Sequence, residues 1–327
     1  MPELRRDPVV GYWTIISTER GRRPLEFKPT HVGLEPDCPY CLKKNVSDAQ
    51  VRVVLSQTPL LRDREELERR GEGLYDLMNG IGRHEIIIES QKHNTEIDEL
   101  SIPQIQEVIS TYASRISEME KDQRLKYALL FKDHGQMTGS SKDSVRHSRS
   151  QLIGMPIIPK RVKEELVATK MYFDRRDRCV FCDILRQEES EGVRVVTQNK
   201  SFFAFCPFAS RSPFEVWILP KKHCADFDKL DPGDTEDFAL ILKECLQKIR
   251  VLLKDPPYNT ILHTAPYRHR KKDIYWKTIE EDYHWYLLIS PRLTHSAGFE
   301  WGTGIHINPT PPEDAALLLR EADAPTT

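Results

Sequence analysis

Residues 146–159 read RHSRSQLIGMPIIP, a polar and cationic cluster that runs directly into an apolar segment ending on proline. This order predicts a strand whose first residues lie in a site and whose later residues lie in a core. Because side chains alternate along a strand, we expect His147, Arg149 and Gln151 to share one face. A metal-capable imidazole, a fixed cation and an amide would then point the same way. Taken alone, the stretch also allows a solvated edge strand.

The order of motifs that leads to this strand occurs twice in the chain. Each copy holds a Cys-x-x-Cys knuckle, a strand, a strand followed by histidine, a long amphipathic helix, a strand, a loop and a strand led by histidine. The first copy uses residues 38–41, 51–55, 84–90, 101–126, 127–131 and 147–159, and the second uses 179–182, 202–205, 214–220, 238–253, 258–263 and 283–291. Such a repeat indicates an internal duplication. One long helix among several strands per copy predicts an α+β fold with mostly antiparallel sheets. We place the first half at residues 1–165 and the second, with a C-terminal tail, at 166–327.

Four further segments carry local expectations. Residues 7–17 predict a strand, a turn at Gly11 and a second strand. The charged run 62–72 predicts a surface helix or a loose loop. The basic loop at 20–24 is either a solvated turn or a loop that faces phosphate. The basic residues 268–272 are better explained as a solvated loop than as a nucleic-acid patch.

The duplication brings metal-ligand chemistry into both halves. Two thiols and two imidazoles in each half suit a tetrahedral Zn²⁺ ion. With four protein ligands each site would be closed, so we expect two structural zinc ions. The alternative is reduced core cysteines beside satisfied histidines. The predicted ligands are Cys38, Cys41, His93 and His147 in the first half and Cys179, Cys182, His223 and His284 in the second.

Composition limits the class of protein. The 327 residues carry a formal net charge of −2, which gives no argument for binding nucleic acid or a membrane. No apolar run has the length of a membrane span, and the N-terminus lacks the layout of a signal peptide. We therefore expect a cytoplasmic protein, in which paired cysteines favour metal over disulfides. Cys206, Cys224 and Cys245 have no spaced partners and are expected to pack.

Many separate stretches of the chain match one family pattern. They are residues 6–8, 13–17, 22–24, both knuckles, 85–90 with His93, 147–159, 213–220, 255–259 and 298–314. On these motifs the chain resembles the galactose-1-phosphate uridylyltransferase family of the histidine-triad superfamily over almost its whole length. The second knuckle is similar to that of the branch with plant-type adenylyltransferases and sugar-nucleotide phosphorylases. The resemblance implies two histidine-triad-like halves, a homodimer, a nucleoside diphosphate sugar or hexose 1-phosphate as substrate, and a place in galactose metabolism.

The resemblance also implies roles for individual residues. In such nucleotidyltransferases the second histidine of a His-x-His-x-Gln motif attacks the α-phosphorus, forming a nucleotidyl-histidine. Gln151 matches the glutamine that holds the phosphoryl oxygens, and Ser148 and Ser150 lie within the same substrate-binding motif. The part that meets the sugar phosphate is matched by Glu300, Gly302, Thr303 and Gly304.

This chain departs from the motif at the nucleophile, where Arg149 stands. A guanidinium stays protonated and has no free lone pair, so it cannot form that intermediate, although it can bind phosphate. Asp133 stands where the family has asparagine, the loop 140–146 is longer and more charged, and residues 55–59 lack the usual asparagine. Three hypotheses remain. The chain acts on nucleotide sugars by direct displacement, or it binds them without catalysis, or His134 replaces the missing nucleophile.

Overall fold

The computed structural model describes residues 1–19, 38–41, 51–63, 66–93, 95–135, 147–269 and 277–323. The predictions for loops 20–24 and 140–146, and for residues 270–272, lie outside the described residues. The strands are β1 (Glu3–Arg6), β2 (Trp13–Ile16), β3 (Arg52–Leu55), β4 (Arg69–Glu72), β5 (Tyr75–Met78), β6 (Arg83–Ile88), β7 (Tyr127–His134), β8 (Arg149–Met155), β9 (Val195–Gln198), β10 (Phe202–Phe205), β11 (Val216–Pro220), β12 (Tyr258–His263), β13 (Tyr286–Pro291) and β14 (His306–Asn308). The helices are α1 (Ile102–Glu120), α2 (Lys160–Arg176), α3 (Val180–Glu191), α4 (Thr235–Leu253), α5 (Ile279–Asp282), α6 (Gly298–Thr303) and α7 (Pro312–Glu321), with short 3-10 turns at Ile97–Glu99, Phe227–Lys229 and Pro232–Asp234.

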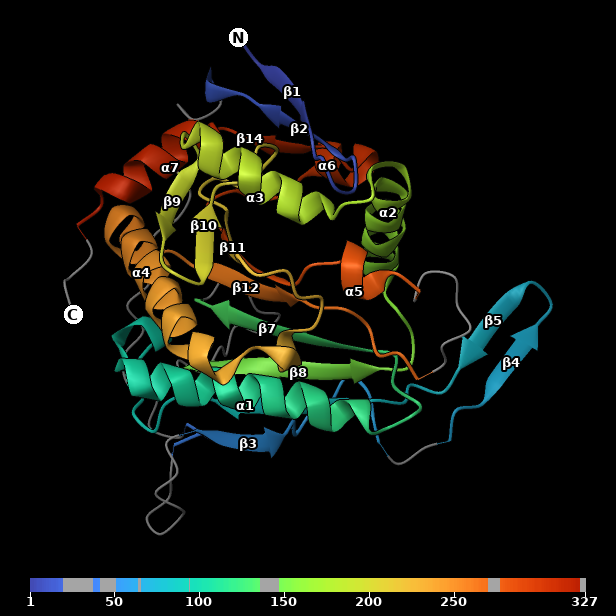
Figure 1. Ribbon diagram of the computed structural model, residues 1–327. Coiled ribbons are helices and arrows are strands. Elements are labelled where there is room, and N and C mark those ends of the chain that lie inside the picture. The colour runs from blue at the N-terminus through green and yellow to red at the C-terminus, as the bar shows by residue number, and fades with distance from the viewer. Residues whose placement is uncertain are drawn as a thin grey trace.

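One nine-stranded sheet contains strands from both copies of the repeat. Its order is β3-β6-β8-β7-β12-β13-β11-β10-β9, and every neighbouring pair is antiparallel. The order β6-β8-β7 of the first copy is mirrored by β12-β13-β11 of the second, so the copies meet at the β7–β12 pair (Figure 1). The predicted α+β class with mostly antiparallel sheets is confirmed. The boundary placed after residue 165 falls inside α2, and the division there stays a prediction.

The helices α1 and α4 cover the same face of this sheet (Figure 1). Ser101 caps α1 together with Gln104, and Pro103 lies in its first turn, where a missing N–H costs nothing. The apolar stripe predicted for this helix is buried against the strands; it consists of Ile105, Val108, Ile109, Tyr112, Ile116 and Met119. Full burial of each such side chain stabilises the fold by about 1.5–3 kcal/mol. The opposite face of the sheet is covered in the second half by α3, whose Phe181 packs near Trp217 and Tyr286.

Three local expectations need correction or completion. The charged run at 62–72 was predicted as a helix or a loop, but its last four residues form the strand β4. This strand pairs with β5 in a hairpin that turns at Gly73, where φ is +64°. The second knuckle is the start of a helix, since Cys179 is the N-cap of α3. The predicted N-terminal hairpin is present, with Gly11 at φ +83°, and β14 extends it in parallel. Among the described residues, no helix is both long and apolar enough to cross a membrane.

Candidate functional site

The first predicted ligand set comes together at the end of the sheet. The ligand atoms of Cys38, Cys41, His93 and His147 all lie within 4.8 Å of one another. The Nδ1 atom of His147 is 3.6 Å from the Sγ of Cys38 and 3.7 Å from the Sγ of Cys41. The Nε2 of His147 donates to the main-chain oxygen of Ser90 at 2.7 Å, which leaves Nδ1 unprotonated and directed at the thiols.

The second set repeats this geometry. The ligand atoms of Cys179, Cys182, His223 and His284 also lie within 4.8 Å of one another. Cys182 Sγ is 3.3 Å from Nδ1 of His223 and 3.7 Å from Nδ1 of His284. The other ring nitrogen of each histidine donates to a main-chain oxygen. For His284 the acceptor is Pro220, at 3.0 Å.

Both groups have the dimensions of a metal site. Bond lengths of about 2.3 Å to sulfur and 2.05 Å to nitrogen place the two ligand atoms about 3.6 Å apart around a tetrahedral zinc ion. The sulfur–nitrogen distances in the two groups span 3.3–3.7 Å. A hydrogen bond from Cys179 is the main cause that lowers the pKa of the Cys182 thiol, which favours the thiolate that metals require. The described Cys and His groups can therefore hold a metal ion.

Arg149 begins β8 directly after the first of these groups. Its Nη1 donates to the main-chain oxygen of His147 at 3.2 Å, and its guanidinium carbon lies 5.1 Å from the ring centroid of Tyr40. Tyr40 stands between the two cysteines of the first knuckle, so the ligand group holds both the strand and the ring that contact this cation.

Gln151 lies two residues further along the same face. Its Nε2 donates to Asp133 on β7 at 3.4 Å. Asp133 also accepts a hydrogen bond from Asn259 on β12, and Asn259 in turn accepts one from Arg292. Burial raises the pKa of Asp133 and outweighs the opposing effects of Asn259, Arg149 and Arg292. Polar groups of both halves thus form one continuous row on the face that α1 and α4 leave uncovered.

The serines that flank Arg149 point to the other face. Ser148 and Ser150 are at most 2% exposed, and both hydroxyls donate to the buried carboxylate of Glu89. Lys132 donates to Glu89 at 2.7 Å and to Ser148 at 2.8 Å. A buried ion pair of this kind stabilises little in itself, but removing one partner is costly. The hydroxyls of these serines are therefore structural, and a substrate-binding role for the two residues stays a prediction.

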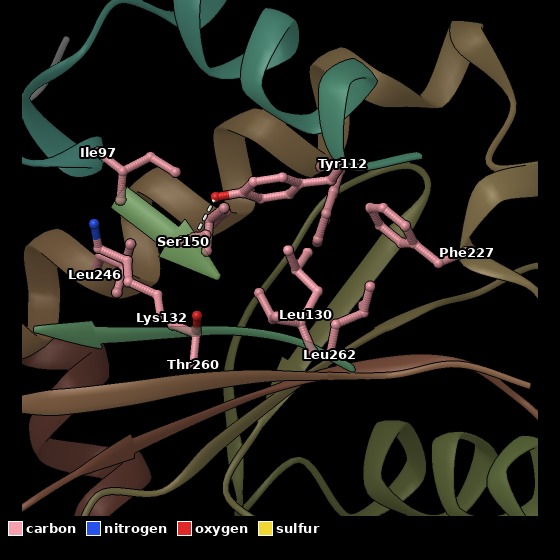
Figure 2. Close-up of a pocket in the computed structure, with 12 residues that line it drawn as sticks. Ile97, Tyr112, Leu130, Lys132, Ser150, Phe227, Leu246, Thr260 and Leu262 are labelled. Carbon is pink, nitrogen blue, oxygen red and sulfur yellow. Dashed lines mark hydrogen bonds between the residues drawn. The ribbon is translucent and has the colours of Figure 1, made fainter. Parts of the chain in front are cut away.

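A small cavity lies beside this network, between the sheet and helices α1 and α4. Figure 2 shows Tyr112 reaching from α1 toward Ser150, with Lys132 and Thr260 nearby. The cavity has a volume of about 20 Å³, which has room for one water molecule and not for a nucleotide. The candidate ligand site is therefore the opposite face, with Arg149 and Gln151.

His134 lies on the helix-covered side and not with Arg149. It follows Lys132 by two residues on β7, contacts Glu96 at 3.4 Å and Asp255 at 3.2 Å, and stacks on Tyr258. Strand alternation directs the His134 ring away from the Arg149 face, which argues against His134 as the replacement nucleophile, and that role stays a prediction.

We expect His134 to make stability depend on pH. Burial lowers its pKa, but hydrogen bonds to Asp255 and Glu96 outweigh burial and raise the pKa to about 9. A raised pKa stabilises the fold below the unfolded value of about 6.5, and this contribution, up to roughly 3 kcal/mol, is lost as pH rises toward 9. In urea titrations from pH 6 to 9.5, the stability gap between wild type and His134→Gln should shrink across this window. The exposed His295→Gln is the control, and a constant gap for His134→Gln would contradict the assignment.

The duplicated position in the second half is closed. Tyr286 follows His284 by two residues, as Arg149 follows His147. The Tyr286 ring stacks on Trp217 at 4.5 Å and on His263 at 4.2 Å between ring centroids, and it is 4% exposed. Aromatic packing occupies the place that a cation takes in the first half, so only the first half presents the predicted phosphate-binding side chains here.

The predicted sugar-phosphate residues lie in and after α6. Glu300 accepts a hydrogen bond from the main-chain N–H of Ala297, while Gly302, Thr303 and Gly304 are exposed. Burial, followed by the cations Arg211 and Arg161, lowers the pKa of nearby His306 to about 4. The role of this segment in binding the sugar phosphate stays a prediction. Sequence reasoning missed His84 and Arg292, whose contacts depend on strand pairing.

Comparisons with known proteins give matches along almost the whole chain. Residues 165–321 match the model for the galactose-1-phosphate uridyl transferase C-terminal domain, and residues 26–158 match that for an N-terminal domain of unknown function, DUF4931. ADP-glucose phosphorylase from Arabidopsis thaliana is 33% identical over 98% of this chain and 93% of its own. Galactose-1-phosphate uridylyltransferase from Thermotoga maritima is 26% identical over 99% of each chain.

Solved structures give the same result. The crystal structure of the Arabidopsis thaliana ADP-glucose phosphorylase with bound ADP-glucose matches with a TM-score of 0.82 and 31% identity over 99% of both chains. A uridylyltransferase structure matches with a TM-score of 0.78 and 26% identity over 98% of both. The identity, the coverage and the shared fold together show that the chain belongs to the galactose-1-phosphate uridylyltransferase family.

Proposed function

We propose that the chain binds a nucleoside diphosphate sugar on the face formed by Arg149 and Gln151 and transfers its nucleotidyl group by direct displacement. The observation that carries this proposal is the placement of Arg149, a cation fixed against Tyr40 and beside the Gln151 amide. Five guanidinium N–H donors and an amide N–H suit the oxygens of a diphosphate. The similar Arabidopsis thaliana protein is named ADP-glucose phosphorylase, and the matching crystal structure of that enzyme holds ADP-glucose, so ADP-glucose is the first substrate to test.

In the proposed reaction the acceptor attacks phosphorus itself. An oxygen of inorganic phosphate or of a hexose 1-phosphate forms the new bond to the α-phosphorus, and the bond from that phosphorus to the sugar phosphate oxygen breaks. The sugar 1-phosphate leaves with the electron pair. Arg149 would act by stabilising the charge that develops on the phosphoryl oxygens. His84, whose imidazole contacts Gln151, has both ring nitrogens engaged in hydrogen bonds and so is a poor candidate for a covalent nucleophile.

We also propose that the two Cys and His groups hold structural Zn²⁺. Zinc would supply rigid four-point ligation in each half and no step of the reaction. In the first half it would fix Tyr40 and β8, and thereby the position of Arg149. A cytoplasmic homodimer remains the expectation from sequence and family resemblance.

Isotope exchange tests the mechanism. A nucleotidyl-enzyme would move labelled glucose 1-phosphate into ADP-glucose without an acceptor, whereas direct displacement needs the acceptor in the same complex. We expect no exchange without inorganic phosphate, together with ADP formation when phosphate is present. Exchange in the absence of phosphate would contradict direct displacement. Tight binding of ADP-glucose without turnover, tested across hexose 1-phosphates as well, would favour a binding protein.

A further inference from the structure

His84 is a buried imidazole next to the proposed phosphate site. It lies on β6, is 6% exposed, and uses both ring nitrogens. The main-chain N–H of Leu60 donates to its Nδ1 at 3.3 Å, and its Nε2 lies 3.0 Å from Oε1 of Gln151.

These two contacts decide which nitrogen carries the proton. A main-chain N–H can only donate, so Nδ1 of His84 must hold a lone pair toward Leu60. Burial lowers the pKa of His84, which favours the neutral ring. The neutral ring then has its single proton on Nε2, and that N–H donates to the side-chain oxygen of Gln151.

The orientation of the Gln151 amide follows from that proton. With its oxygen held by His84, the amide directs its nitrogen away from β6, toward Asp133 on β7. Among the residues that the structure describes, the second N–H of this amide has no partner. A flipped amide would instead present an oxygen, which repels phosphate oxygens.

We propose that His84 is a positioning residue that locks the Gln151 amide with its N–H groups toward the bound phosphate. The identity of the ligand rests on the function proposed above, but the amide orientation does not. His84 touches neither phosphate nor acceptor in this assignment; it acts through Gln151 alone.

A matched pair of variants tests whether the hydrogen bond from His84 orients the Gln151 amide. His84→Gln places an amide nitrogen near the Nε2 position and keeps a donor to Gln151. His84→Asn reaches only the Nδ1 position, so it keeps an acceptor for Leu60 and loses the donor. By calorimetry with ADP-glucose, His84→Asn should weaken binding about tenfold, as expected for one hydrogen bond to a charged group, and His84→Gln should stay within about threefold.

A second pair separates positioning from a general structural effect. If His84 acts through Gln151, adding His84→Asn to Gln151→Ala should change affinity by less than about twofold. Equal losses in both backgrounds, or equal losses for His84→Asn and His84→Gln, would overturn the proposal. Unchanged zinc content in each variant checks that the fold is intact.

A ligand-independent measurement keeps this inference separate from the proposed function. The side-chain amide of Gln151 can be assigned in a ¹H–¹⁵N spectrum by its loss in Gln151→Ala. We expect the chemical shift of the Gln151 side-chain amide to be retained in His84→Gln. In His84→Asn the shift should move toward that of exposed glutamines. If wild type binds no ADP-glucose but this pattern holds, only the proposed function fails. An unchanged Gln151 side-chain resonance in His84→Asn would contradict the positioning role.

Discussion

Replacing Cys182 with serine should halve the bound zinc, from two ions per chain to one, and lower the melting temperature strongly. Cys182 contacts both His223 and His284, so it is the central ligand of its group. Structural zinc contributes on the order of 10 kcal/mol to folding in small zinc domains. Loss of only a third of that amount would lower the melting temperature of a chain of this size by roughly 5 °C. Elemental analysis and calorimetry measure both effects.

Cys224→Ser is the matched control. Its thiol donates to the main-chain oxygen of Asp226 at 3.2 Å and belongs to neither group, and serine can keep that hydrogen bond. We expect two zinc ions and a melting temperature within about 2 °C of wild type. If Cys182→Ser retained two metal ions, or wild type purified from zinc-containing medium had none, the assignment of these groups as zinc sites would be wrong.

Arg149→His should create a nucleotidyl-enzyme. The imidazole would occupy the nucleophile position of the family motif, beside the Gln151 amide, which we propose holds the phosphoryl oxygens. With labelled ADP-glucose, a nitrogen–phosphorus bond would form, glucose 1-phosphate would leave, and the chain would gain the mass of the nucleotidyl group. Mass spectrometry should detect this acid-labile adduct in the variant and not in wild type, and label exchange without phosphate should rise by orders of magnitude.

The nearby carboxylate provides the matched comparison. Asp133 repels phosphate in the absence of the Arg149 cation, so Arg149→His combined with Asp133→Asn should form more adduct than Arg149→His alone. Arg149→Ala should weaken ADP-glucose binding roughly 100-fold, from the loss of a bidentate charged contact, without any adduct. Full binding in Arg149→Ala would show that the nucleotide lies elsewhere.

The ligand groups and the long helices could be predicted because their signals are local. Two cysteines separated by two residues, and histidines at the ends of apolar strands, identified all eight candidate ligands. The apolar stripe along α1 and the cap at Ser101 predicted that helix and its start. Alternation along β8 correctly placed Arg149 and Gln151 on one face, with the serines between them on the other.

Other features depend on which strands pair, and local sequence does not carry that information. The contact of His84 with Gln151 requires β6 beside β8 in one register, where Ile86 faces Gln151. The joining of the halves at β7 and β12 sets Asn259 opposite Asp133. The β4–β5 hairpin was hidden because its charges suggested a solvated segment, although Gly73 offered a turn signal.

The β7–β12 pair makes the two copies of the repeat mutually dependent. Thr260 pairs with Lys132 and Leu262 with Leu130, so cutting the chain between the copies would strip hydrogen-bond partners from two long central strands. Each fragment would expose a partly apolar strand edge whose unpaired main-chain N–H and C=O groups can pair with another strand. Separate fragments would aggregate or reassociate with each other. We therefore expect the two copies to fold as one cooperative unit, so that loss of either ligand group also destabilises the other copy through the β7–β12 pair.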